Sequence, residues 1–383
     1  MSWRFVLWGG LGGVLLFAVA GSGWLLSLPP APSALVAPPI AEQEVAATIA
    51  ALKPPKRNRP LIAIIGINDA TETTDYLTPY GILRRADVAD VVALATAPGP
   101  VKLFPALKVE PQATVAAFDA QHPDGADYVI VPAMSRDDDP AALEWIRSQA
   151  RKGAKVIGVC AGAKVVGKAG LLDGKRATTH WYYLKELQRD NPTLRYVANR
   201  RLVVDGGVAT TTGITASMPM MLTLVEAIAG RQKAEATARM LGLEAWDARH
   251  ASGAFKFTRP FAMTAIRNTL TVWNHEQVGI KLEPGVDEVS LALIADAWSR
   301  TYRSRSVTFA ATGEALESRN GIRIVPDQAA PSWSAGHRLP AIGGEPPVKA
   351  LDQALGAIAA RYGERTADFV AMQLEYPAKR MQD

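Results

Sequence analysis

The sequence predicts an α/β protein with a doubly wound parallel sheet, followed by a second, degenerate copy of the same fold and preceded by a transmembrane helix. Three observations lead to this prediction. Apolar runs alternate with helical patterns between residues 60 and 250, part of that pattern restarts near residue 277, and residues 5–28 contain no charge. A chain of 383 residues with 48% hydrophobic content is long enough for two domains with cores of their own.

The N-terminal segment carries the membrane signal. The chain is uncharged from Phe5 to Leu28, and a helix of that length crosses the hydrocarbon core of a bilayer. We therefore expect residues 1–28 to be an uncleaved anchor with its N-terminus inside. The alternative is a cleaved signal peptide, because Ala18-Val19-Ala20 resembles a processing site. With the anchor retained, the soluble part is expected in the periplasm, which is an oxidising compartment.

The proline-rich residues 29–59 predict a tether without a core. The first folded unit then covers residues 60–250. Its apolar runs are typical of strands that are covered on both faces, and the helical patterns between them predict parallel crossover connections. The expected strands are 61–65, 91–96, 128–131 and 156–159, with two short strands around Gly206-Gly207. A loop and a helix are expected over 69–86, and helical patterns lie at 140–152 and 217–239.

Residues 251–383 are predicted to be the degenerate second unit. The patterns at 288–310 and 357–376 repeat those at 72–96 and 227–246. In the middle of this unit, a stretch rich in proline and glycine stands where the first unit has its third and fourth strands and its cysteine. We therefore expect the second unit to lack a nucleophile.

Composition excludes several classes of protein. The 42 Lys and Arg residues against 37 Asp and Glu give a net charge of +5, but the basic residues are scattered, so no nucleic-acid partner is expected. A single cysteine, Cys160, can form neither an internal disulfide nor a zinc site with several cysteines. We expect no metal and no cofactor. The thiol is then either a buried small hydrophobic group or a functional group.

The neighbours of Cys160 favour a functional thiol. The predicted strand 156–159 leads directly into Cys160, and a helical pattern follows. A sharp turn of this kind needs small residues, which Ala161 and Gly162 supply, and the helix N-terminus stabilises a thiolate. The N–H groups of Ala161 and Gly162, chiefly that of Ala161, could bind an oxyanion that forms on a substrate. The structural alternative is an inert buried cysteine at the end of a strand.

The segment GVCAGAKVVGKAGLLDGKRATTHW, residues 158–181, resembles the elbow region of the DJ-1/PfpI superfamily, in particular isocyanide hydratases and the amidase-like domain of AraC-type regulators. The similarity extends over roughly residues 60–245. It implies a flavodoxin-like sheet, a thiolate nucleophile and an acid in the loop after the first strand. By this resemblance the acid is Asp75, four residues before Pro79.

A carboxyl group beside a thiolate stays protonated, so Asp75 could deliver a proton to a substrate. Glu72 or Asp69 could take its place, and helix N-capping is the structural alternative for Asp75. The resemblance also implies that His180 lies near the cysteine. It could act as a general base or proton shuttle, and a structural role for this histidine is the alternative.

Three departures from the family pattern limit what the resemblance implies. Ala161 stands where the peptidase-like branch has histidine. Pro132-Ala133-Met134 stands where the family often has Pro-Gly-Gly. This change leaves the second oxyanion donor of the family without a clear counterpart, and the Met134 side chain is expected to narrow the pocket. The regulators' helix-turn-helix is absent, and the second unit has Ser290 at the position of the acid. We expect that unit to cover the first as an intramolecular pseudo-dimer partner, with a homodimer also open.

Two functions remain open at this point. The first is hydration or hydrolysis of a small electrophile, such as an isocyanide, aldehyde or amide, through a covalent adduct on Cys160. The alternative is a non-catalytic sensor or scaffold that binds a small ligand at the same turn or reports oxidation of Cys160.

Overall fold

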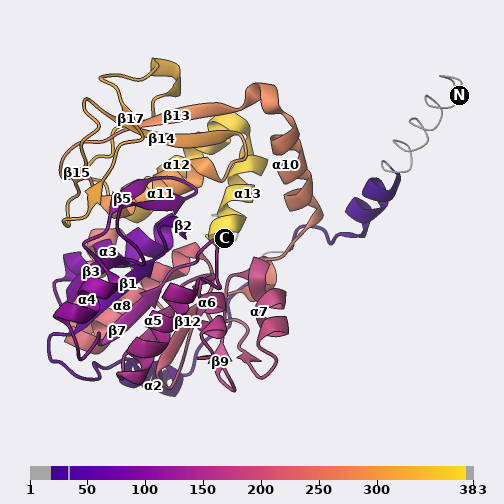
Figure 1. Ribbon diagram of the computed structural model, residues 1–383. Coiled ribbons are helices and arrows are strands. Elements are labelled where there is room, and N and C mark those ends of the chain that lie inside the picture. Colours follow the sequence, from indigo (N-terminus) through magenta and orange to yellow (C-terminus); the bar gives the residue numbers. More distant parts are fainter. Residues whose placement is uncertain (1–18, 33–34, 377–383) are drawn as a thin grey trace, which may run out of the picture.

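The computed structural model describes residues 19–32 and 35–376 (Figure 1). Most of the predicted anchor, residues 1–18, lies outside the described residues, and residues 19–27 are helical. Over the described ranges, no helix has the length and apolar character that crossing a membrane requires. The anchor receives no support from these residues and stays a prediction from the sequence.

The first unit is built on a seven-stranded mixed sheet in the order β11-β12-β8-β7-β1-β3-β6. In that order the strands are Leu202–Asp205, Val208–Thr211, Lys155–Gly158, Tyr128–Val131, Leu61–Gly66, Asp90–Ala95 and Ala113–Thr114. All neighbouring strands are parallel except β11 and β12. The predicted parallel sheet is therefore correct for six strands and wrong at the β11 edge, where the Gly206-Gly207 turn makes a hairpin. The inner order β3-β1-β7-β8-β12 is the flavodoxin-like one.

Alternate residues of β1 belong to different cores, one on each face of the sheet. Ile62 and Ile64 join the core that contains α3 and α8, whereas Ala63 and Ile65 join the core that contains α5 and α6. The helices of this unit are α3 (Thr73–Ala86), α4 (Val115–Gln121), α5 (Pro140–Arg151), α6 (Gly162–Lys168), α7 (Leu184–Asp190), α8 (Ser217–Ala229) and α9 (Arg231–Leu241). Helix α2 (Glu42–Ala51) lies in the predicted tether 29–59 but packs on α8 of this unit. The single helix predicted for 217–239 is two helices, because Gly230 has a φ of 86°.

The second unit has a smaller parallel sheet in the order β13-β14-β17. These strands are Glu276–Lys281, Ser304–Ala310 and Gln328–Ala329. The helices are α10 (Arg259–Leu270), α11 (Glu288–Ser299), α12 (Pro347–Tyr362) and α13 (Glu364–Leu374). In Figure 1 this unit, orange to yellow, lies over the carboxyl ends of the first unit's central strands.

The two units are joined by a shared sheet and by a helix pair. The sheet β15-β16-β5-β4-β2 combines β2 (Asp69–Glu72), β4 (Val101–Phe104) and β5 (Lys108–Glu110) with β15 (Leu316–Glu317) and β16 (Arg323–Ile324). Helices α3 and α11 pack together, and Gly81 leaves room for Glu288 and Val289. A buried ion pair between Arg85 and Asp287, 2.8 Å long, crosses the same interface. A short ladder of β9 (Arg176–Ala177) and β10 (Arg195–Tyr196) completes the first unit.

Candidate active site

Cys160 sits at the turn between β8 and α6, as the sequence predicts. Its φ is +55°, in the left-handed region that residues with a side chain rarely adopt. The turn is held at both ends, because the Cys160 N–H donates to Thr211 Oγ1 at 3.0 Å and the Cys160 carbonyl accepts from Thr179 Oγ1 at 3.0 Å. This strained and well-anchored backbone aims the thiol at the carboxyl end of the sheet.

The two small residues after the cysteine do different things. Ala161 lines the cavity beside the thiol. Burial raises the pKa of the Cys160 thiol, and the Ala161 N–H offsets only part of that rise. The N–H of Gly162 donates to Val159 O at 2.7 Å, so it is not a free oxyanion donor. Gly162 is needed for space, because a Cβ at this position would overlap the Val131 carbonyl. Of the two predicted donors, only Ala161 remains available.

Asp75 lies in the first turn of α3 and is completely buried. Its Oδ2 accepts a hydrogen bond of 3.0 Å from the Ala133 N–H, while Oδ1 has no partner. Glu72, not Asp75, is the N-cap of α3, since its Oε2 accepts from the Asp75 N–H at 2.6 Å. Asp69 is exposed and lies beside Lys102. The capping alternative for Asp75 is therefore wrong, and Asp69 cannot replace it near the thiol.

Burial controls the protonation of this pair. It raises the pKa of the Cys160 thiol well above its ordinary value, and the charges of Asp75 and Glu72 raise it further. Burial, followed by the charge of Glu72, also raises the pKa of Asp75 well above its ordinary value. Both shifts favour the protonated form of the group, which suits Asp75 to donating a proton.

The Pro132-Ala133-Met134 segment supports the acid instead of supplying an oxyanion donor. The N–H of Ala133 is taken up by Asp75. Met134 lines the cavity, as predicted, and forms a bridge to Thr71.

His180 is buried, with both ring nitrogens engaged. Nδ1 accepts from the Tyr182 N–H at 3.2 Å, so the proton must be on Nε2, which donates to Gln373 O at 2.9 Å. Burial lowers the pKa of His180. The ring is thus neutral and links the first unit to α13, an arrangement that matches the structural alternative for this residue.

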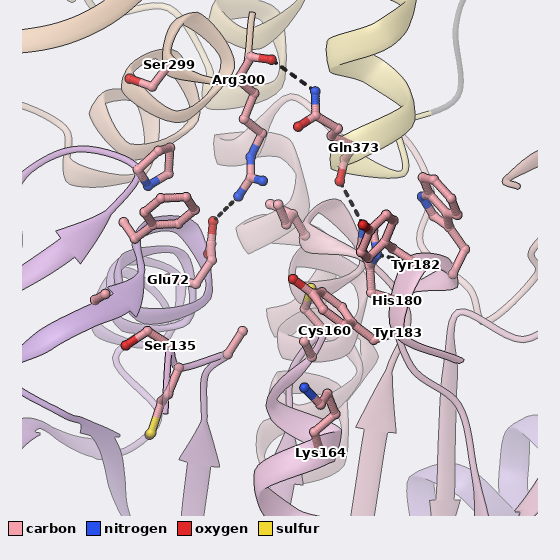
Figure 2. Close-up of a pocket in the computed structure, with 18 of the residues that line it drawn as sticks. Glu72, Ser135, Cys160, Lys164, His180, Tyr182, Tyr183, Ser299, Arg300 and Gln373 are labelled. Carbon is pink, nitrogen blue, oxygen red and sulfur yellow. Dashed lines mark hydrogen bonds and ion pairs between the residues drawn. The ribbon is translucent and has the colours of Figure 1, made fainter. Parts of the chain in front are cut away.

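The second unit contributes residues to the site that the sequence analysis did not identify. Arg300, which follows α11, donates from Nη2 to Glu72 Oε1 at 2.8 Å and from Nε to Asp296 Oδ1 at 2.7 Å. Gln373 donates from Nε2 to Arg300 O at 3.0 Å (Figure 2). Burial raises the pKa of Asp296 to about 8. No motif marks these residues, and only the expectation that the second unit covers the first could have directed attention to them.

A cavity of about 650 Å³ lies between the two units, with the thiol on its floor and Arg300 above it (Figure 2). Its polar lining includes Glu72, His180 and Gln373. This volume suits a small molecule. Much of the wall is aromatic, contributed by Phe104, Trp181, Tyr182, Tyr183, Phe257, Phe261 and Tyr302. One cation at the wall, Lys164, is paired with Asp137 at 2.8 Å and Glu186 at 3.0 Å. Over the described ranges, no three His, Cys, Asp or Glu side chains gather where they could hold a metal ion.

Fold and site together define an α/β domain with a cysteine elbow. The DJ-1/PfpI family matches residues 62–227, and this part of the chain is a DJ-1/PfpI domain.

Curated relatives are similar over shorter stretches. An isonitrile hydratase from Pseudomonas putida is 44% identical over 99 residues, which are 26% of this chain and 42% of the relative. The HTH-type transcriptional regulator CdhR from Pseudomonas aeruginosa is 39% identical over 95 residues, 25% of this chain and 28% of the relative. The chain thus spans less than half the length of either protein.

Among solved structures, Drosophila melanogaster DJ-1beta is similar with a TM-score of 0.44 and 22% identity. That similarity covers 49% of this chain and all of the other.

Proposed function

We propose that the DJ-1/PfpI domain hydrates or hydrolyses a small electrophile through a covalent adduct on Cys160, with Asp75 as the proton donor. The observation that carries this proposal is the pairing of a strained, cavity-facing cysteine with a buried carboxylic acid whose Oδ1 has no partner. The similarity to an isonitrile hydratase supports an isocyanide as the first substrate to test.

The chemistry follows from the positions of these groups. The sulfur attacks the terminal carbon of R–N≡C, and Asp75 transfers its proton to that carbon, which gives a thioimidate, R–N=CH–S–Cys160. Water then adds to the C=N carbon, the C–S bond breaks, and the formamide R–NH–CHO leaves as the thiol regains a proton. The Ala161 N–H can stabilise charge on the adduct. The thiol proton leaves to solvent before attack, and Asp75 regains a proton from solvent after the formamide has left. The raised pKa of Cys160 makes the loss of the thiol proton the demanding step.

The direct test is the formation of an N-substituted formamide from an alkyl isocyanide, followed by mass spectrometry. Cys160→Ser should abolish turnover, and Asp75→Asn should lower it by about 10²-fold or more, as expected for loss of a general acid. Asp69→Asn is the matched control, because Asp69 is exposed and should leave the rate unchanged. Equal activity in Asp75→Asn and Asp69→Asn would contradict the role of Asp75.

A second candidate is a sensor that binds a small ligand without turnover. The burial of Cys160, which is only 4% exposed, favours it, and so does the presence of HTH-type regulators among the relatives. The pH dependence of Cys160 alkylation by iodoacetamide separates the two. A thiol that reacts only at high pH, in a protein that turns over no isocyanide, aldehyde or amide, would favour the sensor.

For residues 251–383 we propose a degenerate DJ-1/PfpI-like unit that takes the place of a dimer partner. Two features support this. Helices α12 and α13 are joined by Gly363 with φ 89° and ψ 154°, as α8 and α9 are joined by Gly230 with φ 86° and ψ 168°, and α11 packs on α3. The full chain should sediment as a monomer, and a stable homodimer would contradict the proposal.

For residues 1–28 we propose a membrane anchor with the two units in the periplasm, supported by the uncharged run from Phe5 to Leu28. Protease treatment of spheroplasts should degrade the soluble part. Full protection in spheroplasts with degradation after lysis would contradict this location.

A further inference from the structure

Helix α10 carries an exposed apolar stripe that the proposed chemistry does not use. Met263, Ile266 and Leu270 follow helical spacing, and Val272 and Trp273 continue the stripe beyond the helix. The exposed fractions are 50% for Met263, 40% for Ile266, 66% for Leu270, 63% for Val272 and 77% for Trp273. A contiguous row of large apolar side chains exposed to this extent marks an interaction surface.

The other faces of α10 are occupied. Ala262, Thr264 and Asn268 are buried in the second unit, while Phe261 and Ala265 line the cavity. Helix α10 therefore forms part of a cavity wall with its other side exposed, and it lies at the edge of the molecule in Figure 1.

The N-terminal chain is attached to the start of this helix. The guanidinium of Arg259 donates to the carbonyl oxygens of Leu25, Leu26 and Leu28, at 3.1, 2.8 and 3.2 Å, and the Arg259 N–H donates to Pro29 O at 2.8 Å. Trp24 lies against Phe257, with ring centroids 6.1 Å apart. The end of the apolar run Phe5–Leu28 is thus fixed to the start of α10.

Arg267 is an exposed cation on the same helix as the stripe. From residue 248 to residue 275 the chain contains the cations Arg249, Lys256, Arg259 and Arg267 and no Asp or Glu. Basic residues beside exposed apolar and tryptophan side chains are typical of helices that lie in the interface of an anionic bilayer.

We propose that this stripe, together with Arg267, docks on the surface of an anionic lipid bilayer and holds α10 flat against it. This proposal rests on the proposed membrane anchor, because the apolar N-terminal run would hold α10 close to the bilayer. It does not depend on the chemistry proposed for Cys160. Docking places one wall of the cavity at the lipid surface, so apolar molecules dissolved in the bilayer are the ligands with the shortest path to the site.

The experiment uses the full chain in vesicles of phosphatidylcholine with or without phosphatidylglycerol. Because Cys160 is the only cysteine, a Cys160→Ser background allows an environment-sensitive fluorophore on Leu270→Cys. Glu144→Cys on α5 is the matched control, with a side chain 65% exposed. We expect a blue shift and quenching by brominated lipid for the label at position 270, stronger with phosphatidylglycerol, and neither for the label at 144.

Identical emission from the two labels in protein-loaded vesicles would overturn the proposal. A blue shift without lipid that grows with protein concentration would also overturn it, because a second copy would then cover the stripe. If the labelled variants fail to fold, brominated-lipid quenching of the native tryptophans, compared with Trp273→Phe, gives the same information. Quenching that does not fall in Trp273→Phe would count against docking.

Discussion

Arg300 is the residue through which the second unit acts on the site, and Arg300→Met tests that role. The substitution keeps the length and most of the apolar stem of the side chain and removes the charge. It breaks two ion pairs, with Glu72 at 2.8 Å and with Asp296 at 2.7 Å. Glu72 is left as a buried carboxylate without a cation.

The expected cost follows from this burial. The side chain of Arg300 is 15% exposed and that of Glu72 is 8% exposed, and removing one partner of a buried pair costs about 3–5 kcal/mol. The entropy of unfolding is about 2.1 cal/mol/K per residue, so in a chain of 383 residues a change of 1 kcal/mol lowers Tm by about 1 °C and the expected loss is about 4–6 °C. The pKa of Cys160 should also rise further, since an unpaired Glu72 repels the thiolate.

Differential scanning fluorimetry measures the first effect, and the pH dependence of iodoacetamide alkylation measures the second. Arg59→Met is the matched control. Arg59 pairs with Asp87 and Asp90 at 2.8 and 2.9 Å, but its side chain is 50% exposed, and surface pairs contribute only about 0–1 kcal/mol.

The double variant Arg300→Met/Glu72→Gln separates an unpaired charge from lost packing. Removing the orphaned carboxylate should restore part of the lost stability, so the double variant should be more stable than the sum of the single variants predicts. A loss no larger than that of Arg59→Met, or strict additivity in the double variant, would refute the reasoning.

Three further outcomes follow from single contacts. Gly162→Ala should prevent stable folding, because its Cβ would overlap the Val131 carbonyl, whereas Gly356→Ala in the open middle of α12 should raise Tm slightly; equal soluble yields and Tm values would contradict this. Burial raises the pKa of Asp296 to about 8, so between about pH 4 and pH 8 the folded protein holds a proton on Asp296 that the unfolded chain does not. The free energy of unfolding should therefore fall as the pH rises through this range. Asp296→Asn should flatten that dependence in urea titrations. His180→Gln should leave the pH profile of Cys160 alkylation unchanged, because both ring nitrogens are already bonded; loss of an inflection near neutral pH would show a proton-transfer role instead.

The predicted strands and helices of the first unit agree closely with those observed, and the reason is local. Apolar runs such as Leu61–Ile65 can only be buried as central strands, and small residues around Cys160 permit a positive φ. Where the pattern is ambiguous, prediction fails. The 217–239 pattern has one periodicity but is broken by Gly230, and the β11 edge is antiparallel because a two-glycine turn reverses the chain.

The sequence by itself determined the fold class and the position of the cysteine turn, because each depends on residues close together in the chain. Only the tertiary structure decided which groups share the cavity. Arg300 and Gln373 lie more than a hundred residues from Cys160 in the chain and reach the site because α11 packs on α3 and α13 lies over His180. Protonation was decided in the same way, since burial between the two units, and not residue type, raises the pKa values of Cys160, Asp75 and Asp296.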